Sequence, residues 1–327
     1  MTSKERVIRT LKHDHPDRVP IDLWSLPATQ AGYESELPRL LERYPLDIAG
    51  AARTDPMADG RIYTKGTYVD PWGVTFLNLQ DGIFPEAKGH PLADWSALED
   101  YRIDMSVLDQ GWEVTEESIR DNRDKFIVCG GINPWERMQF LRGTEALYMD
   151  LMEQPAEVFA LRDMVFGYYR ELIRRWVSFD VDAVFIADDW GSQRALLIPP
   201  RIWRSFFRPA YQAIIDIAKG AGKYVFFHSD GNILEIYDDF IAMGVDAVNS
   251  QVWCMGLDEV ARWAGKITFW GEISRQDTLP HGTPEDIRAA ALQMKERLWQ
   301  DGGLIGQSEA GPDVPLANIE ALLTAWN

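Results

Sequence analysis

The residues best suited to chemistry lie at the end of one apolar run. The segment Val225-Phe226-Phe227 stops abruptly at His228, and Asp230 follows two positions later. A buried strand has no internal use for a histidine and a carboxylate at its end, so we expect these side chains to face a site or to cap the next element. His228 could be a metal ligand, a general acid or base, or a hydrogen-bonded residue at a strand terminus.

Polar residues also end the other short β-prone runs of the chain. We predict strands at 126–129, 183–186, 224–227, 245–248, 267–270 and 304–305. The polar residues at or just after these ends are Asp188, Asp189, Trp190, Gln193, His228, Asp230, Asn249, Gln251, Glu272 and Glu309. Side chains at the carboxyl ends of successive parallel strands converge on one face, where α/β barrels build their sites. The sequence therefore predicts one acidic cleft.

The carboxylates of this cleft predict a bound divalent cation. Several carboxylates close together repel one another unless a cation, a proton or a basic substrate intervenes. Cys129 and Cys254 show no metal-binding spacing, so nitrogen and oxygen would hold the ion. Nitrogen and oxygen ligands of this kind are compatible with zinc, and also with manganese, iron or magnesium. Each residue also has a structural alternative: Asp188 or Asp189 could cap a helix, and Glu309 could lie in water.

Amphipathic stretches between these runs position the predicted cleft. Apolar residues near one side of 157–176 indicate a helix, and Thr283-Pro284-Glu285-Asp286 begins another with an N-cap and a first-turn proline. This alternation of strands and helices is typical of a parallel sheet with crossover helices. An open doubly wound sheet would also gather ligands at its strand ends, but no glycine-rich nucleotide-binding loop follows a run.

The length fits one large domain, 1–327, with two additions to the repeating pattern. A closed α/β barrel typically needs about 250 residues plus insertions. A short helix after Ser3 forms an N-terminal extension before a first strand at 19–24. In 60–85, short apolar runs are broken by glycine, aspartate and proline, which predicts a β-hairpin insertion.

Charge and composition exclude several classes of protein. The 327 residues carry a formal net charge of -18, which disfavours binding to nucleic acids and to anionic lipid surfaces. Apolar stretches fall short of the roughly 20 residues that a membrane-spanning helix needs. The charged N-terminal segment is unlike a signal peptide, so we expect a cytoplasmic protein.

Ordered motifs along nearly the whole chain resemble the uroporphyrinogen decarboxylase superfamily, which also contains cobalamin-dependent methyltransferases. The matching segments are His15-Pro16-Asp17-Arg18-Val19-Pro20, Asp188 to Gln193, His228 to Ile233, Gly244 to Asn249, Phe269 to Ile273 and Pro280 to Glu285. The resemblance implies a (β/α)8 TIM barrel with a deep cleft at the carboxyl ends of its strands.

The details of the resemblance separate two chemistries. The region Leu23 to Tyr33 matches an N-terminal loop of the decarboxylases, but the two arginines of that loop are absent. The chain is also similar to the methyltransferase branch, whose members hold zinc with a His-x-Cys-Gly segment and a later cysteine. His228 matches the histidine, while Asp230 and Ser308 stand in place of the cysteines. Oxygen ligands favour demethylation of an oxygen or nitrogen methyl donor over methylation of a thiol.

We therefore expect a metal-dependent methyltransferase that moves a methyl group between a small molecule and a corrinoid carried by a partner protein. The metal ligands would be His228, Asp230 and Glu309. The other candidate residues divide into catalytic and substrate-binding groups: Asp188, Asp189, His228 and Glu272 for the first, and Trp190, Gln193, Asn249 and Gln251 for the second. The alternatives are a decarboxylase of a tetrapyrrole or another carboxylated substrate and a non-catalytic ligand-binding barrel. The resemblance also implies a homodimer.

Overall fold

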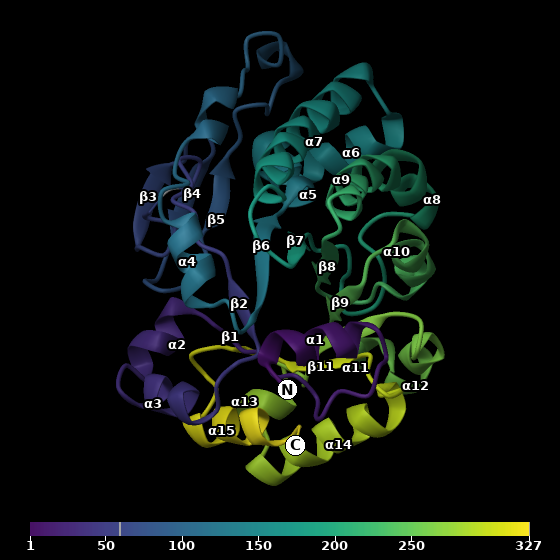
Figure 1. Ribbon diagram of the computed structural model, residues 1–327. Coiled ribbons are helices and arrows are strands. Elements are labelled where there is room, and N and C mark those ends of the chain that lie inside the picture. Colours follow the sequence, from purple (N-terminus) through teal and green to yellow (C-terminus); the bar gives the residue numbers. More distant parts are fainter. Residues whose placement is uncertain (59, 327) are drawn as a thin grey trace.

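A curled parallel sheet forms the centre of the computed structural model, which describes residues 1–58 and 60–326 (Figure 1). Within these residues seven strands pair in the order β11-β10-β9-β8-β7-β6-β2. Their bounds are β2 (Ile48–Gly50), β6 (Phe126–Ile132), β7 (Ala183–Ala187), β8 (Tyr224–Ser229), β9 (Ala247–Ser250), β10 (Thr268–Glu272) and β11 (Leu304–Gln307). The six strands predicted from residue 126 onward are confirmed, and several extend into the polar residues that we expected to follow them. The first strand, predicted at 19–24, is not formed as such: this segment has an isolated bridge at Ile21, and a two-residue strand begins only at Trp24.

The segment around Ile21 lies between the two edges of this sheet. Ile21 forms a parallel bridge with Gly306 of β11, and the backbone N–H of Asp47 donates to the Ile21 carbonyl at 2.9 Å. Just beyond, β1 (Trp24–Ser25) pairs in parallel with β12 (Glu309–Ala310). The sheet therefore curls into the predicted TIM-barrel-like fold, with the first chain segment beside the last strand.

Apolar side chains fill the interior of the barrel. Each strand of the parallel sheet contributes one buried residue to a single cluster, which also contains Val7: Ile48, Phe126, Ala183, Phe226, Ala247, Trp270 and Ile305. Val7 belongs to α1 (Ser3–Leu11), the predicted N-terminal extension, which contacts β2, β6 and β11. Because the interior is packed, a ligand can meet side chains only at the ends of the barrel, and barrels of this kind place their sites at the carboxyl ends of the strands.

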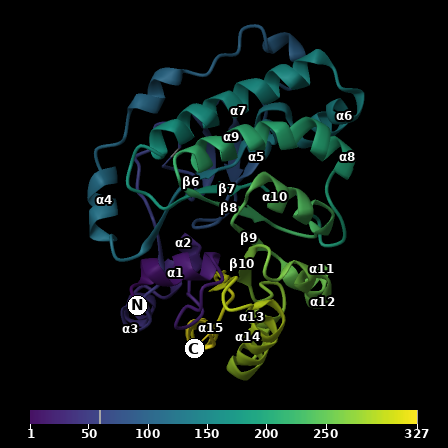
Figure 2. The same ribbon diagram turned by 45° about the vertical axis from the view of Figure 1, so that its right-hand side comes forward.

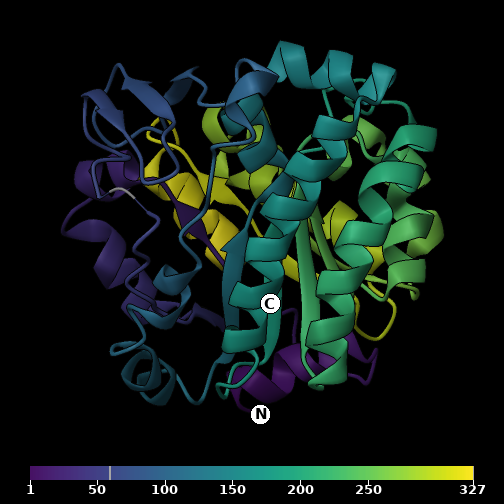
Figure 3. The same cartoon turned by 90° about the horizontal axis from the view of Figure 1, so that it is seen from above.

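Helices cover the outside of the strands (Figures 2 and 3). The remaining helices are α2 (Pro27–Gly32), α3 (Glu36–Arg43), α4 (Thr115–Asp121), α5 (Pro134–Arg142), α6 (Thr144–Glu153), α7 (Ala156–Trp176), α8 (Pro200–Ile202), α9 (Arg208–Gly220), α10 (Tyr237–Met243), α11 (Val252–Met255), α12 (Leu257–Val260), α13 (Thr278–His281), α14 (Pro284–Leu298) and α15 (Leu316–Thr324). The three helices predicted from sequence patterns, α1, α7 and α14, are confirmed. At the start of α14, Thr283 Oγ1 accepts from the Asp286 backbone N–H at 3.3 Å.

The predicted hairpin insertion is the first part of a larger antiparallel sheet. In its described residues, β3 (Gly66–Val69), β4 (Thr75–Asn78) and β5 (Glu86–Gly89) pair in chain order. Asp70 forms the first turn by accepting from the backbone N–H groups of Trp72 and Val74, at 3.0 and 2.8 Å. Its other oxygen accepts from Arg137 of α5 at 2.7 Å. This ion pair ties the insertion to the barrel.

The described helices include none with the length and apolar character needed to cross a membrane.

Candidate active site

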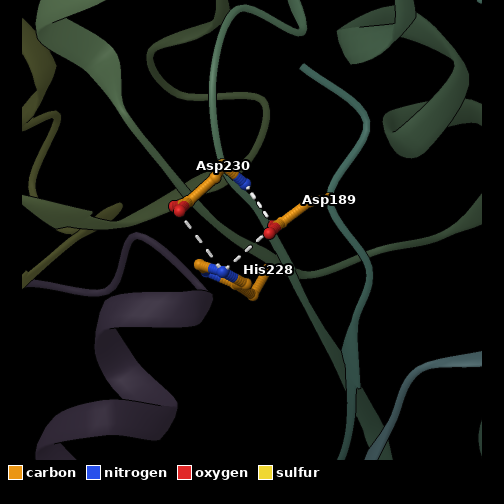
Figure 4. Close-up of side chains that lie close together, drawn as sticks. All are labelled: Asp189, His228 and Asp230. Atoms are coloured by element: carbon orange, nitrogen blue, oxygen red, sulfur yellow. Dashed lines mark hydrogen bonds and ion pairs between the residues drawn. The ribbon is translucent and has the colours of Figure 1, made fainter. Parts of the chain in front are cut away.

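Three of the predicted residues come together at the ends of β7 and β8 (Figure 4). His228 Nε2 lies 3.4 Å from Asp189 Oδ1 and 3.6 Å from Asp230 Oδ1. One nitrogen or oxygen atom from each of the three residues lies within 4.8 Å of the others. The Asp230 backbone N–H also donates to Asp189 Oδ1 at 2.8 Å, which holds the two aspartates in register. We call these three residues the donor cluster.

Asn249 of β9 fixes the orientation of the His228 ring. Asn249 Nδ2 donates to the Trp270 carbonyl and, at 2.6 Å, to Gln307 Oε1, so Oδ1 of its amide faces His228. That oxygen lies 2.5 Å from His228 Nδ1, which must carry a proton to make the contact. Nε2 therefore faces the carboxylates, either as a free ligand atom or as a second protonated nitrogen.

Charges around the donor cluster set its protonation. Burial alone would lower the pKa of His228, but the hydrogen bond and charge of Asp189 and the charge of Asp230 raise it to about 9. Burial would likewise raise the pKa of Asp189, and the contact with His228 outweighs this and lowers it. Without a bound metal ion, His228 is thus protonated at neutral pH and places a positive charge between the two aspartates.

Arg275, which the sequence analysis missed, lies beside the donor cluster. Its Nη2 pairs with Asp230 Oδ1, its Nε with Glu272 Oε1 at 3.1 Å and its Nη1 with Glu309 Oε1 at 3.0 Å. These acids come from the ends of different strands, and the arginine side chain is only 18% exposed. The spacing Glu272-x-x-Arg275 just after a strand was the available signal, but it does not reveal three simultaneous partners.

Glu272 and Glu309 are the other two partners of this arginine, and Glu272 is almost fully buried. Burial raises the pKa of Glu272 to about 7, against the opposing effect of Arg275. Glu309 lies beside Trp24 in the register of β12 with β1. Glu309, which we predicted as a metal ligand, thus contacts Arg275. Asp189, which we predicted as a catalytic residue, lies next to His228.

Asp188 lies in the protein interior, beneath the start of α5. It is fully buried and accepts from the backbone N–H groups of Trp135 and Glu136, both at 3.0 Å, and from Tyr211 Oη at 2.6 Å. Burial, reinforced by the charge of Glu136, raises its pKa well above the usual value. These contacts give Asp188 a structural task in positioning the N-terminus of α5.

Trp190 is also fully buried, and its ring stacks on Trp135 at 4.7 Å between centroids. The two glutamines predicted to bind substrate form a hydrogen bond with each other: Gln193 Nε2 donates to Gln251 Oε1 at 2.7 Å. The same oxygen lies 3.3 Å from the Gly231 backbone N–H, directly after Asp230. The glutamine pair therefore joins the loops that follow β7, β8 and β9, while Trp190 supports them from within.

Trp24 of β1 forms the apolar floor under His228. The centroid of its ring lies 5.3 Å from that of His228 and 5.0 Å from that of Trp270, in edge-on arrangements. Trp270 belongs to the packed barrel interior, so Trp24 separates this interior from the donor cluster. Nothing in the sequence around Trp24 indicated its contact with His228.

The comparisons with known proteins agree with this architecture. Residues 73–327 match the family model described as uroporphyrinogen decarboxylase (URO-D). The chain belongs to the uroporphyrinogen decarboxylase family. The comparison with curated protein sequences finds no match.

Solved structures similar to this family member include two enzymes. A methyltransferase from Methanosarcina mazei shares 19% sequence identity with the chain, with a TM-score of 0.74 over 99% of this chain and 98% of that one. A glycosylated endo-β-1,4-xylanase from Gloeophyllum trabeum shares 9% identity, with a TM-score of 0.48 over 97% and 98% of the two chains. At these identities the first similarity establishes the fold.

A cavity of about 240 Å³ lies between the barrel and the insertion of this uroporphyrinogen decarboxylase family member, and its lining residues do not include those of the donor cluster. It is bounded by the end of β6, by α7 and by the insertion, and β6 pairs with β7, which leads to Asp189. Aromatic rings form much of its wall: Tyr68, Trp72, Phe76, Phe84, Phe140, Tyr168 and Tyr169. On the cavity wall, Asn133 accepts from Tyr169 Oη at 3.0 Å and donates to Glu136 at 2.9 Å. Glu136 is close enough to Asp189 and His228 for their charges to affect its pKa.

Proposed function

We propose that this protein is a methyltransferase that uses a divalent cation, held by His228, Asp189 and Asp230, to move a methyl group from a small molecule to a corrinoid. The observation that carries the proposal is the orientation of His228. Asn249 Oδ1 accepts a hydrogen bond from Nδ1–H of His228 and leaves Nε2 facing two carboxylates, an arrangement typical of metal-bound histidines. A nitrogen with two oxygens suits zinc and also manganese or iron.

The charge balance supports a cation at this position. Among the described residues, Asp189, Asp230, Glu272 and Glu309 meet two basic groups, Arg275 and His228. Carboxylates thus outnumber cations even when His228 is protonated. A divalent ion that replaced the histidine proton would reduce this excess, and its affinity would rise with pH as that proton is lost.

The residues around the donor cluster have separate tasks in the proposed reaction. A bound cation would act as a Lewis acid toward the oxygen or nitrogen that loses the methyl group. The small molecule would lie in the aromatic cavity beside β6, and Trp24 would keep the floor of the site apolar. The methyl group would pass to a corrinoid held by a partner protein, and the electron pair of the broken bond would stay on the leaving atom.

Metal analysis of the purified protein is the first test. We expect about one equivalent of zinc, manganese or iron per chain, and loss of that metal in His228→Ala. His281→Ala is the matched control, because His281 is an exposed histidine of α13. The loaded protein is then mixed with cob(I)alamin and a panel of O-methyl and N-methyl donors, and methylcobalamin is followed by absorbance. A protein without metal, with equal activity in His228→Ala, would overturn the proposal.

Decarboxylation is a second candidate, favoured by Arg275. Its guanidinium and a protonated His228 could bind a substrate carboxylate and return a proton to carbon without a metal. Carbon dioxide release from uroporphyrinogen by EDTA-treated protein would decide for this reaction. The same treatment should abolish the proposed methyl transfer.

A further inference from the structure

Arg275 and the donor cluster share a single oxygen atom. Oδ1 of Asp230 faces His228 Nε2 at 3.6 Å, and the same Oδ1 pairs with Arg275 Nη2. The two other guanidinium contacts, to Glu272 and Glu309, involve oxygens outside the donor cluster. Only one of the three arginine contacts therefore concerns a proposed cation ligand.

A divalent cation and a guanidinium that contact the same carboxylate oxygen repel each other. Zinc lies about 2 Å from a carboxylate oxygen, and a charge-assisted N–H···O bond spans about 2.8 Å. The two positive groups would then lie only about 4–5 Å apart in a largely buried site, where their repulsion is poorly screened. The Arg275 side chain is 18% exposed and that of Asp230 is 31% exposed, so water offers limited relief.

Arg275 keeps two other partners when its contact with Asp230 is broken. Glu272 is almost fully buried, and Glu309 lies at the mouth of the barrel, so both can keep hold of Nε and Nη1. These two contacts, through Nε and Nη1, do not involve Nη2, the nitrogen that pairs with Asp230. The arginine is therefore placed to yield one partner and retain two.

We propose that Arg275 is the counter-cation of the metal-free site, which pairs with Asp230 and gives up this carboxylate when the divalent cation binds. The inference rests on the proposed function in that it takes Asp230 as a cation ligand. In this role Arg275 is a positioning residue: it keeps Asp230, Glu272 and Glu309 together before the cation arrives. It also weakens cation binding, because its contact with Asp230 must be broken.

Calorimetric titration with zinc tests this exchange. We expect Arg275→Gln to bind zinc at least about tenfold more tightly than the unchanged protein, because a competing charge is removed. Arg275→Lys should give a smaller gain, since it keeps the charge but cannot contact three carboxylates. Arg297→Gln, which removes an exposed arginine paired with Asp258 at the surface, is the control and should leave zinc affinity unchanged. Circular dichroism checks that each variant is folded.

A double substitution shows whether the effect passes through Asp230. Asp230→Asn should weaken zinc binding, and adding Arg275→Gln to it should bring little further gain. An undiminished gain in that background, or equal zinc affinity in Arg275→Gln and the unchanged protein, would overturn the inference and leave the proposed function standing. Tighter zinc binding by Arg275→Gln, in a protein that shows no methyl transfer, would support the inference and overturn the proposed function. A protein that binds no zinc in any variant would contradict both.

Discussion

At the scale of single residues, the tautomer of one histidine decides the chemistry of the site. His228 is anchored through Asn249, which is itself fixed by the Trp270 carbonyl and by Gln307. The imidazole consequently presents Nε2 toward Asp189 and Asp230 and cannot turn without breaking buried hydrogen bonds. Residues that do not touch a ligand can therefore control how well His228 binds one.

Replacing Asn249 tests this control. We expect Asn249→Leu to weaken zinc binding by roughly 10–100-fold, because His228 Nδ1 loses its acceptor and the ring loses its fixed tautomer. Zinc titration calorimetry measures the effect. Asn122→Ala, which removes an amide bonded to Ser118 on α4, should bind zinc like the unchanged protein. Equal affinity in Asn249→Leu would show that the ring is held by other contacts.

A second residue, Asp22, should make stability depend on pH. Burial raises its pKa from 3.8 to about 6, against the hydrogen bonds from Leu23 and Trp270. The folded protein therefore keeps a proton that the unfolded chain releases, so stability falls as the pH rises from about 4 to about 6. A shift of this size corresponds to about 3 kcal/mol at neutral pH.

Asp22→Asn removes this titration and keeps an oxygen that can accept from Trp270 Nε1, at 3.1 Å in the structure. Relative to the unchanged protein, the unfolding free energy of the variant should increase by up to about 3 kcal/mol between pH 4 and pH 7. Urea unfolding at several pH values gives the difference, and a constant cost of burying the new amide does not alter its slope. Parallel pH curves for the two proteins would contradict the prediction.

At the scale of elements, the site depends on how the loops after β6, β7 and β8 are held. Asp188 binds the N-terminus of α5 from the end of β7, and the Gln193 and Gln251 pair connects the loops beyond β7 and β9. The sequence indicated that these polar residues share one edge of the sheet. It could not tell which side chains turn inward to other elements and which turn toward the cleft.

Removing the carboxylate of Asp188 should therefore harm stability. Asp188→Ala leaves the backbone N–H groups of Trp135 and Glu136 and the Tyr211 hydroxyl without their acceptor in the interior. We expect a loss of roughly 2–5 kcal/mol in the free energy of unfolding, measured in urea. Asp216→Ala, at an exposed aspartate of α9, is the control and should change stability by less than about 0.5 kcal/mol. A small effect in Asp188→Ala would mean that α5 is held without it.

At the scale of the whole molecule, the barrel is a packed body with its chemistry confined to one end. One side chain from each parallel strand, with Val7 of α1, fills the interior, and Trp24 closes this core beneath His228. The donor cluster draws its ligands from the end of β8 and from the residues that follow β7 and β8, so a bound cation should stabilise the folded chain as a unit.

Zinc should accordingly raise the melting temperature of the whole protein. At a free concentration about 100 times its dissociation constant, a ligand bound only to the folded state adds about 2.7 kcal/mol. Thermal unfolding with zinc, and then with an excess of EDTA, should show a reversible rise that His228→Gln abolishes. An equal rise in His228→Gln would place the zinc elsewhere. His281→Ala should respond like the unchanged protein.

The sequence by itself determined the alternation of strands and helices, the edge at which polar residues gather, and the pair His228 and Asp230. These follow from local patterns, because hydrophobic periodicity and strand-end polarity are written along the chain. The tertiary structure decided that Asp189 joins the pair, that Asp188 supports α5, and that Arg275 contacts three acids. Those outcomes depend on side-chain directions and on contacts between residues far apart in the chain, which spacing along the sequence does not specify.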